Sequence, residues 1–150
     1  MNRREQIKLT PDEQTAFLRE CRKVSLATLD KEGFPHLVAM NFVALDGTIY
    51  MSSYGKAQKV VNIRRNPKVA VMAESGKSYA QLRGIMIRGN CEIIEDRKSV
   101  AELMGAIRGR DTGDEETPPI PEQILTKRVI LKVVPKKVTS WDHSKLGGRY

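Results

Sequence analysis

Residues 34–53 have the sequence FPHLVAMNFVALDGTIYMSS, and this stretch best indicates the fold. Residues 34–45 form one long run of mostly apolar, strand-favouring residues. Asp46-Gly47 then supplies a two-residue hairpin signal, and we expect residues 48–53 to return as the paired strand. A hairpin at this point favours antiparallel pairing for the sheet as a whole.

Other parts of the chain predict further strands and a few short helices. Strand-like runs occupy residues 24–29, 68–74, 81–94 and 128–134, residues 137–140 extend the last run past Pro135, and residues 141–150 form a tail. Helical spacing predicts helices over residues 11–23, 55–66 and 96–109, the first with a capping box that begins at Thr10. Some six short strands and only three helices predict a mainly β fold, a six-stranded antiparallel barrel flanked by short helices.

Length and composition limit the classes of protein to consider. The 150 residues suit a single domain over residues 1–150, and 40 % hydrophobic with 29 % charged residues is typical of a globular protein. No apolar run approaches the roughly 20 residues that a membrane span needs, and no secretion signal opens the chain, so we expect a cytoplasmic protein. Cys21 and Cys91 are too isolated to indicate a disulfide framework or a zinc site.

The charge is strongly basic and unevenly distributed. The formal net charge is +8, but residues 111–122 hold five acids and no basic residue, so the other 26 basic and 13 acidic residues give the remainder +13. Such a surplus predicts an anionic partner. Nucleic acid, an acidic membrane surface and a phosphorylated small molecule all fit it equally well.

The motifs of side-chain catalysis are missing. Gly76-Lys77-Ser78 lacks the first glycine of a phosphate-binding P-loop, and there is no GxGxxG, GxSxG or HExxH pattern. The chain has two histidines, His36 and His143, and no cluster with metal-ligand spacing. We therefore expect no catalytic side chain and no metal, and a bound cofactor that carries any reaction.

Residues 51–67 contain the pattern most typical of a binding site. A strand ends in hydroxyls, passes Gly55 and enters a basic helix, so hydroxyl and ammonium donors gather near helix N–H groups that favour an anion. The candidate phosphate ligands are Ser52, Ser53, Lys56 and Lys59. The alternative is a solvated basic helix whose valines and isoleucine only pack.

Six segments, in order and spacing, resemble one known family. They are residues 26–36, 49–53, 59–69, 79–84, 89–96 and 141–148, which together cover nearly the whole chain. The chain resembles the split β-barrel flavin and deazaflavin oxidoreductases related to pyridoxamine 5′-phosphate oxidase. It departs from true pyridoxamine phosphate oxidases in length and in its ending, because residues 145–150 lack their Arg-Leu substrate motif. Oxidation of pyridoxine 5′-phosphate itself is therefore not expected.

The resemblance implies a homodimer with two cofactor sites at the subunit interface, each lined by both chains. The coenzyme would be FMN or the F-420 type of deazaflavin, with its phosphate near the four hydroxyl and lysine residues and its ring along residues 38–42. The implied cofactor-binding residues are Met40, Asn41, Ser52, Ser53, Lys56, Lys59 and Trp141. Trp141, with His143 beside it, would either reach the ring or anchor the tail to the barrel.

Two classes of function follow from these observations. The first is an oxidoreductase that transfers hydride to or from a small-molecule substrate in the dimer cleft. The alternative is a non-catalytic protein of the same fold that binds, stores or senses a flavin, a deazaflavin or a heme-sized ligand. Nucleic-acid binding is not expected, because the eight aromatic residues are dispersed and no recognition motif is present.

Overall fold

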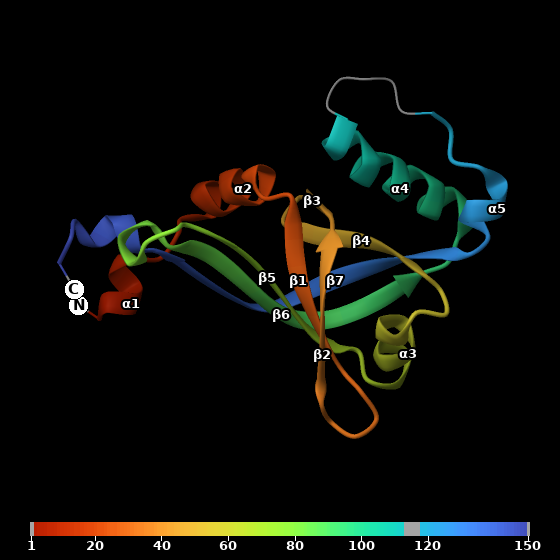
Figure 1. Cartoon of the computed structure of the whole chain (residues 1–150), viewed down its shortest axis with the longest axis horizontal. Helices are drawn as coiled ribbons and strands as arrows, with labels where there is room; N and C mark the ends of the chain where they lie inside the picture. Colours follow the sequence, from red (N-terminus) through yellow and green to blue (C-terminus); the bar gives the residue numbers. More distant parts are fainter. Residues whose placement is uncertain (1, 113–117, 150) are drawn as a thin grey trace.

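The computed structural model describes residues 2–112 and 118–149. Within these residues the protein is mainly β, with short helices around a curled antiparallel sheet (Figure 1). The strands are β1 (Lys23–Leu29), β2 (Pro35–Asn41), β3 (Val43–Leu45), β4 (Thr48–Tyr54), β5 (Lys68–Ser75), β6 (Arg83–Ile94) and β7 (Arg128–Asp142). The α-helices are α1 (Arg3–Gln6), α2 (Pro11–Glu20), α3 (Gln58–Arg65), α4 (Arg97–Thr112) and α5 (Glu122–Leu125), with 3-10 helices η1 (Tyr79–Gln81) and η2 (His143–Leu146).

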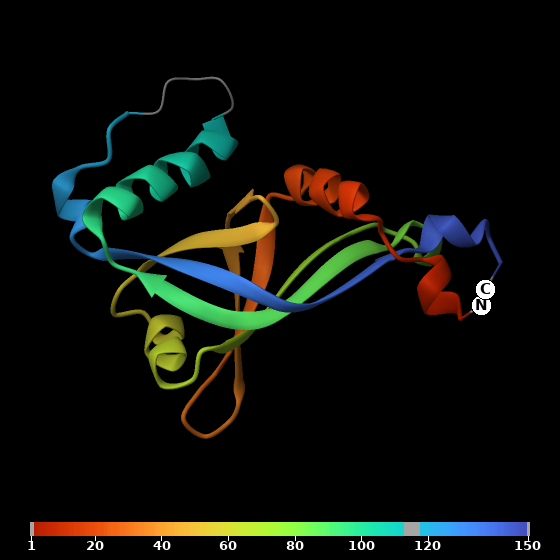
Figure 2. The ribbon, with the colours of Figure 1, turned by 180° about the vertical axis from the view of Figure 1, so that it is seen from behind.

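The sheet has the curled form of a split barrel. Its strand order is β2-β1-β5-β6-β7-β4-β3, and every neighbouring pair is antiparallel. Figures 1 and 2 show β1 and β2 crossing steeply over the long β6–β7 pair, so the sheet curls around its own inner face. The predicted antiparallel split barrel is confirmed.

The described residues contain seven strands where the sequence predicted six, because residues 34–45 do not form one strand. The run breaks at Phe42: β2 pairs with β1, whereas β3 pairs with β4 at the opposite end of the strand order. Phe42 is buried, with 1 % of its surface exposed. The break carries the chain from one edge of the sheet to the other.

The predicted hairpin at Asp46-Gly47 is confirmed. Asp46 has φ 51° and Gly47 has φ 78°, so both residues occupy the left-handed region that a two-residue type I′ turn requires. This turn sets the register in which Leu45 faces Thr48. β4 is thereby aligned so that Ser52 and Ser53 lie near its end.

Two hydrophobic clusters stabilise the fold. The larger fills the inside of the curl, with Leu26, Met51 and Leu131 among its fully buried members. The smaller lies on the outer face of the sheet, where Val100, Met104 and Ile107 of α4 pack against residues such as Val43 and Ile130. Helix α4 is thus fixed over β4 and β7, beside the end of β4.

The ends of several elements differ from the predicted ones. Helix α2 has the expected capping box at Thr10 but ends at Glu20, because Lys23 already pairs in β1. The predicted helix over residues 55–66 is shorter, since residues 55–57 form the turn before α3. Helix α4 continues past Gly109 to Thr112. The acidic loop predicted over residues 111–122 falls partly on residues 113–117, which lie outside the described residues, and its last residue begins α5.

Strand β7 is longer than predicted and includes Trp141, which the sequence assigned to the tail. The strand accommodates Pro135 through a bulge: Arg88 pairs with Lys137 and Gly89 with Pro135, so Lys136 is left without a partner in the register. A Cβ on Gly89 would lie 2.0 Å from the carbonyl oxygen of Val134, so only glycine fits there. The far end of β7 holds the N-terminal segment, since the N–H of Asp142 donates to the carbonyl of Ile7 at 2.7 Å.

No helix in the described ranges is long and apolar enough to cross a membrane.

Candidate functional site

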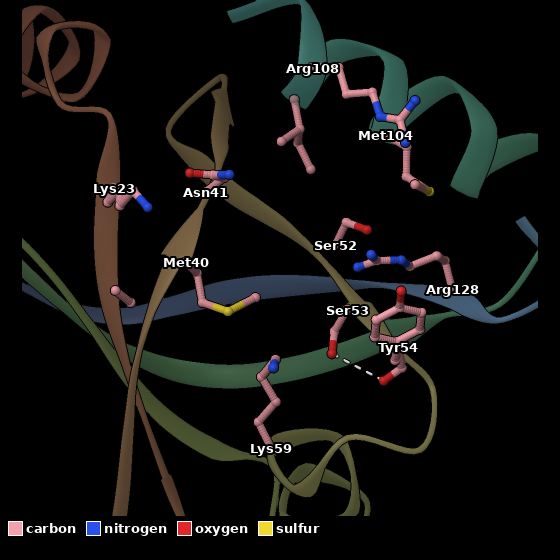
Figure 3. Close-up of a pocket in the computed structure, with 12 residues that line it drawn as sticks. Lys23, Met40, Asn41, Ser52, Ser53, Tyr54, Lys59, Met104, Arg108 and Arg128 are labelled. Atoms are coloured by element: carbon pink, nitrogen blue, oxygen red, sulfur yellow. Dashed lines mark hydrogen bonds between the residues drawn. The ribbon is translucent and has the colours of Figure 1, made fainter. Parts of the chain in front are cut away.

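A cavity of about 320 Å³ opens at the end of β4, where α3, α4 and the strands β1, β2 and β7 also meet. We call it the β4 cavity, and Figure 3 shows its lining. The lining residues are Lys23, Ala39, Met40, Asn41, Ser52, Ser53, Tyr54, Lys59, Met104, Ile107, Arg108 and Arg128. Segments far apart in the sequence therefore contribute to one site.

Two buried polar atoms of this lining lack a hydrogen-bond partner among the described residues. They are the Oγ of Ser52 and the Nε of Arg128. By contrast, the Oγ of the neighbouring Ser53 donates to the carbonyl of Tyr54 at 3.0 Å. A buried polar group without a partner costs about 1 to 3 kcal/mol, so these two atoms mark a position where a ligand with acceptor atoms would be stabilised.

The guanidinium of Arg128 is held against an aromatic ring. Its Cζ lies 3.9 Å from the centre of the Tyr54 ring, a cation–π contact between residues that face each other in the β4–β7 register. Figure 3 shows the guanidinium directed into the cavity beside this ring. The stacking restricts the orientation of the side chain before any ligand binds.

Lys59 approaches the same cavity from the first turn of α3. Burial lowers the pKa of this lysine, and the nearby charge of Arg128 lowers it further. Helix α3 has Ala57 at its N-cap, which provides no side-chain hydrogen bond to the helix N-terminus. An anion in the cavity would therefore meet an ammonium group that is destabilised in the empty site.

The charged residues that line the β4 cavity are all basic. The lining contains four basic residues, Lys23, Lys59, Arg108 and Arg128, and no aspartate or glutamate. Hydroxyl donors, two guanidinium groups and two ammonium groups around a small cavity suit a phosphate group. The arrangement fits the phosphorylated end of a coenzyme.

The structure brings together five of the seven predicted cofactor-binding residues. Met40, Asn41, Ser52, Ser53 and Lys59 all line the β4 cavity. Lys56 and Trp141 do not.

Lys56 lines a different cavity on the far side of the turn before α3, although only three positions separate it from Lys59. Trp141 packs on Gly84 across the β6–β7 pair, near the chain termini. Within this chain, Trp141 therefore lies at the far end of β7 and does not reach the cavity.

Sequence reasoning did not find Arg128, Tyr54, Arg108 or Lys23. Arg128 is the first residue of β7, and only the pairing of β7 with β4 brings it to Tyr54. That pairing joins segments more than 70 positions apart, and no local pattern encodes it. The sequence signal that could have found Tyr54 is its position directly after Ser52 and Ser53.

The histidines and cysteines lie outside the lining of the β4 cavity. The Nδ1 of His143 is 2.9 Å from the carbonyl oxygen of Tyr79, and the two rings are 4.5 Å apart, so His143 anchors the tail. Burial raises the pKa of the Cys91 thiol to about 12, as suits a packing residue. Among the described residues there is no cluster of three side chains that could hold a metal ion.

The sequence profile of the family described as pyridoxamine 5'-phosphate oxidase matches residues 10–142. The chain belongs to this family, and its split barrel is a flavin-binding fold.

Solved structures agree with this assignment. A conserved hypothetical protein, Rv2991 from Mycobacterium tuberculosis, is 33 % identical with a TM-score of 0.87 over 100 % of this chain and 95 % of its own. An F420 reductase is 26 % identical with a TM-score of 0.68 over 83 % of this chain and 94 % of its own. The FAD and heme binding protein from Mycobacterium smegmatis has a TM-score of 0.77 over 89 % of this chain and 71 % of its own, and at 12 % identity it shares the fold alone. No curated protein matches the chain.

Proposed function

We propose that this protein is an oxidoreductase that holds FMN or an F-420 type deazaflavin with its phosphate in the β4 cavity. The observation that carries the proposal is a pair of buried atoms, Ser52 Oγ and Arg128 Nε, that have no hydrogen-bond partner within residues 2–112 and 118–149. They lie in a lining with four basic residues and no carboxylate. These groups fit a phosphate dianion, because each can donate a charge-assisted or hydroxyl hydrogen bond to it.

The bound coenzyme would supply hydride transfer, and the chain would supply binding and orientation. Ser52, Lys59 and Arg128 hold the phosphate, and Tyr54 keeps the Arg128 guanidinium in place. Met40 and Asn41 of β2 lie on the opposite wall, beside which the ring would lie. Fixing the ring in this way positions a small substrate without a side-chain nucleophile.

Two observations support the deazaflavin branch without excluding FMN. One of the similar solved structures is an F420 reductase. The basic surplus outside residues 111–122 also suits the glutamate tail of the F-420 coenzyme. The substrate class in the proposal is a small conjugated molecule.

The proposal includes a homodimer in which the second chain covers the exposed face of β2. Leu37 is 69 % exposed on this strand and Phe34 is 66 % exposed just before it, which is unusual for large apolar side chains. Strand β2 is also an edge of the sheet. Light scattering of the purified protein should give twice the chain mass, and Leu37→Glu should shift it toward the monomer.

A non-catalytic binder is the second candidate function. The β4 cavity contains no histidine, cysteine or carboxylate that could act as an acid or base, and a protein described as binding FAD and heme has the same fold. Such a protein would bind the coenzyme as tightly but would not turn over. Steady-state assays with a reductant and an electron acceptor separate the two candidates.

The decisive test of the site is equilibrium titration with FMN and with the deazaflavin coenzyme. We expect Ser52→Ala and Lys59→Ala each to weaken binding about tenfold, the effect of one charged contact. Lys136→Ala, on the β7 bulge away from the cavity, is the matched control. Unchanged affinity in both site variants would refute the phosphate assignment.

A further inference from the structure

A second and larger cavity, of about 810 Å³, lies between α5, the turn before α3 and the start of α4. We call it the α5 cavity. It is lined by Tyr54, Gly55, Lys56, Arg64, Glu95, Arg97, Leu125, Thr126, Lys127, Arg128 and Val129. Its size falls within the range of small-molecule sites, roughly 300 to 1,000 Å³.

The lining of this cavity is also strongly basic. It contains five basic residues and a single acid, Glu95. Arg64 pairs with Glu95 at 2.5 Å and Arg97 pairs with Glu122 at 2.6 Å, so part of this charge is neutralised. Lys56 and Lys127 form no salt bridge with any described residue. Two ammonium groups thus remain for an external anion.

The cavity also offers apolar surface. Leu125 of α5 and Val129 of β7 form part of its wall, and Gly55 adds a stretch of backbone without a side chain. An inorganic ion would use only the charged groups. A lining that is both apolar and cationic suits an organic molecule with several negative charges.

We propose that the α5 cavity binds a multiply charged organic anion, bearing phosphates or carboxylates, as a site separate from the β4 cavity. Lys56 and Lys127 are its main charged contacts, and Arg64 and Arg97 reinforce them from within their salt bridges. Lys56, which does not line the β4 cavity, thus has a binding role in the α5 cavity. This proposal does not depend on whether the β4 cavity binds a coenzyme.

The test uses the full-length chain and two probes, inorganic tripolyphosphate and a tri-glutamate peptide, each titrated by calorimetry. We expect Lys56→Gln and Lys127→Gln each to weaken probe binding about three- to tenfold. Lys136→Gln, which removes an exposed charge elsewhere, should leave the affinity for both probes unchanged. Ser52→Ala, which alters only the β4 cavity, should leave the affinity for the tri-glutamate peptide unchanged. Both lysines targeted are exposed, so the variants should keep the thermal stability of the wild type.

The outcomes separate the possibilities. Binding of tripolyphosphate alone supports a phosphate-bearing ligand, and binding of the peptide alone or of both supports a carboxylate-accepting site. If Ser52→Ala weakens binding while the two lysine variants do not, the anion occupies only the β4 cavity and the proposal is wrong. A loss in Lys136→Gln equal to that of the cavity variants, or no binding of either probe to the wild type, overturns it as well.

Discussion

Trp141 and Gly84 face each other across β6 and β7, and the indole ring occupies the space where a side chain of residue 84 would be. A Cβ on Gly84 would lie 2.2 Å from Cζ2 of Trp141. We therefore expect Gly84→Ala to lower the free energy of unfolding by about 1 to 3 kcal/mol, because the ring must move. Urea unfolding measures this.

The control for Gly84 is Gly105→Ala in α4. A Cβ there meets nothing within 4 Å, so the free energy of unfolding should rise by about 0.5 to 1 kcal/mol. If Gly84→Ala unfolds like the wild type, the Trp141 contact does not restrict residue 84.

Arg110 fixes the last turn of α4 to the rest of the molecule. Its guanidinium donates to the carbonyls of Phe42 at 2.8 Å and Cys21 at 2.7 Å, and also to those of Leu18 and Arg19 at the end of α2. We expect Arg110→Ala to cost about 1.5 to 3 kcal/mol of stability in thermal or urea unfolding. Lys98→Ala, an exposed change in the first turn of α4, should stay within about 0.5 kcal/mol of the wild type. Equal effects of the two would contradict the bridging role of Arg110.

Asn62 connects α3 to the sheet from a fully buried position. Its Nδ2 donates to the Oγ1 of Thr28 at 3.0 Å, and its Oδ1 accepts from Gln58 at 2.8 Å. We expect Asn62→Ala to lower the free energy of unfolding by about 1 to 3 kcal/mol, because the Thr28 hydroxyl loses its partner. Coenzyme affinity should fall too, since α3 carries Lys59.

The control for Asn62 is the exposed neighbouring position on the same helix. Val61→Ala should leave both stability and affinity near the wild-type values. A stable Asn62→Ala protein with normal affinity would show that α3 is positioned by its apolar face alone.

Lys59 should make coenzyme binding sensitive to alkaline pH. Its pKa is lowered in the empty cavity, mainly by burial, and a bound phosphate raises it again because the anion favours the charged lysine. Affinity should therefore be full below the pKa of the free protein, fall as pH rises through it, and level off above the pKa of the complex. Titrations from neutral pH to about pH 10, close to the usual pKa of a lysine, measure this fall in affinity.

Lys59→Arg is the control for this pH dependence, because a guanidinium stays protonated throughout the range. Its affinity should be independent of pH on the alkaline side. A wild-type profile as flat as that of the arginine variant would mean that Lys59 does not contact the bound anion.

The sequence predicted structural features well where a few adjacent residues determine them. The Asp46-Gly47 hairpin and the Thr10 capping box were placed correctly because a few adjacent residues fix their backbone. The break at Phe42 was missed because its cause lies elsewhere, in the different partners of β2 and β3. Gly109 did not end α4, because a glycine inside a helix only weakens it.

The candidate site was likewise predictable where its residues are close together in the sequence. Ser52, Ser53 and Lys59 come from one continuous stretch whose strand-to-helix order already favours an anion. Arg128 reaches the β4 cavity only through the long-range pairing of β7 with β4. Lys56 does not line this cavity, because the turn before α3 directs its side chain to the α5 cavity. Side-chain direction at that turn depends on backbone detail that sequence spacing does not contain.

Tyr54 and Arg128 line both cavities, so the stacked pair is a shared wall. A molecule that shifts the guanidinium in one cavity necessarily changes the surface of the other. Any cooperativity between the two cavities must then be reciprocal, with each occupant altering the affinity of the other by the same factor. Because one guanidinium cannot fully neutralise two anions at once, we expect such cooperativity to be negative.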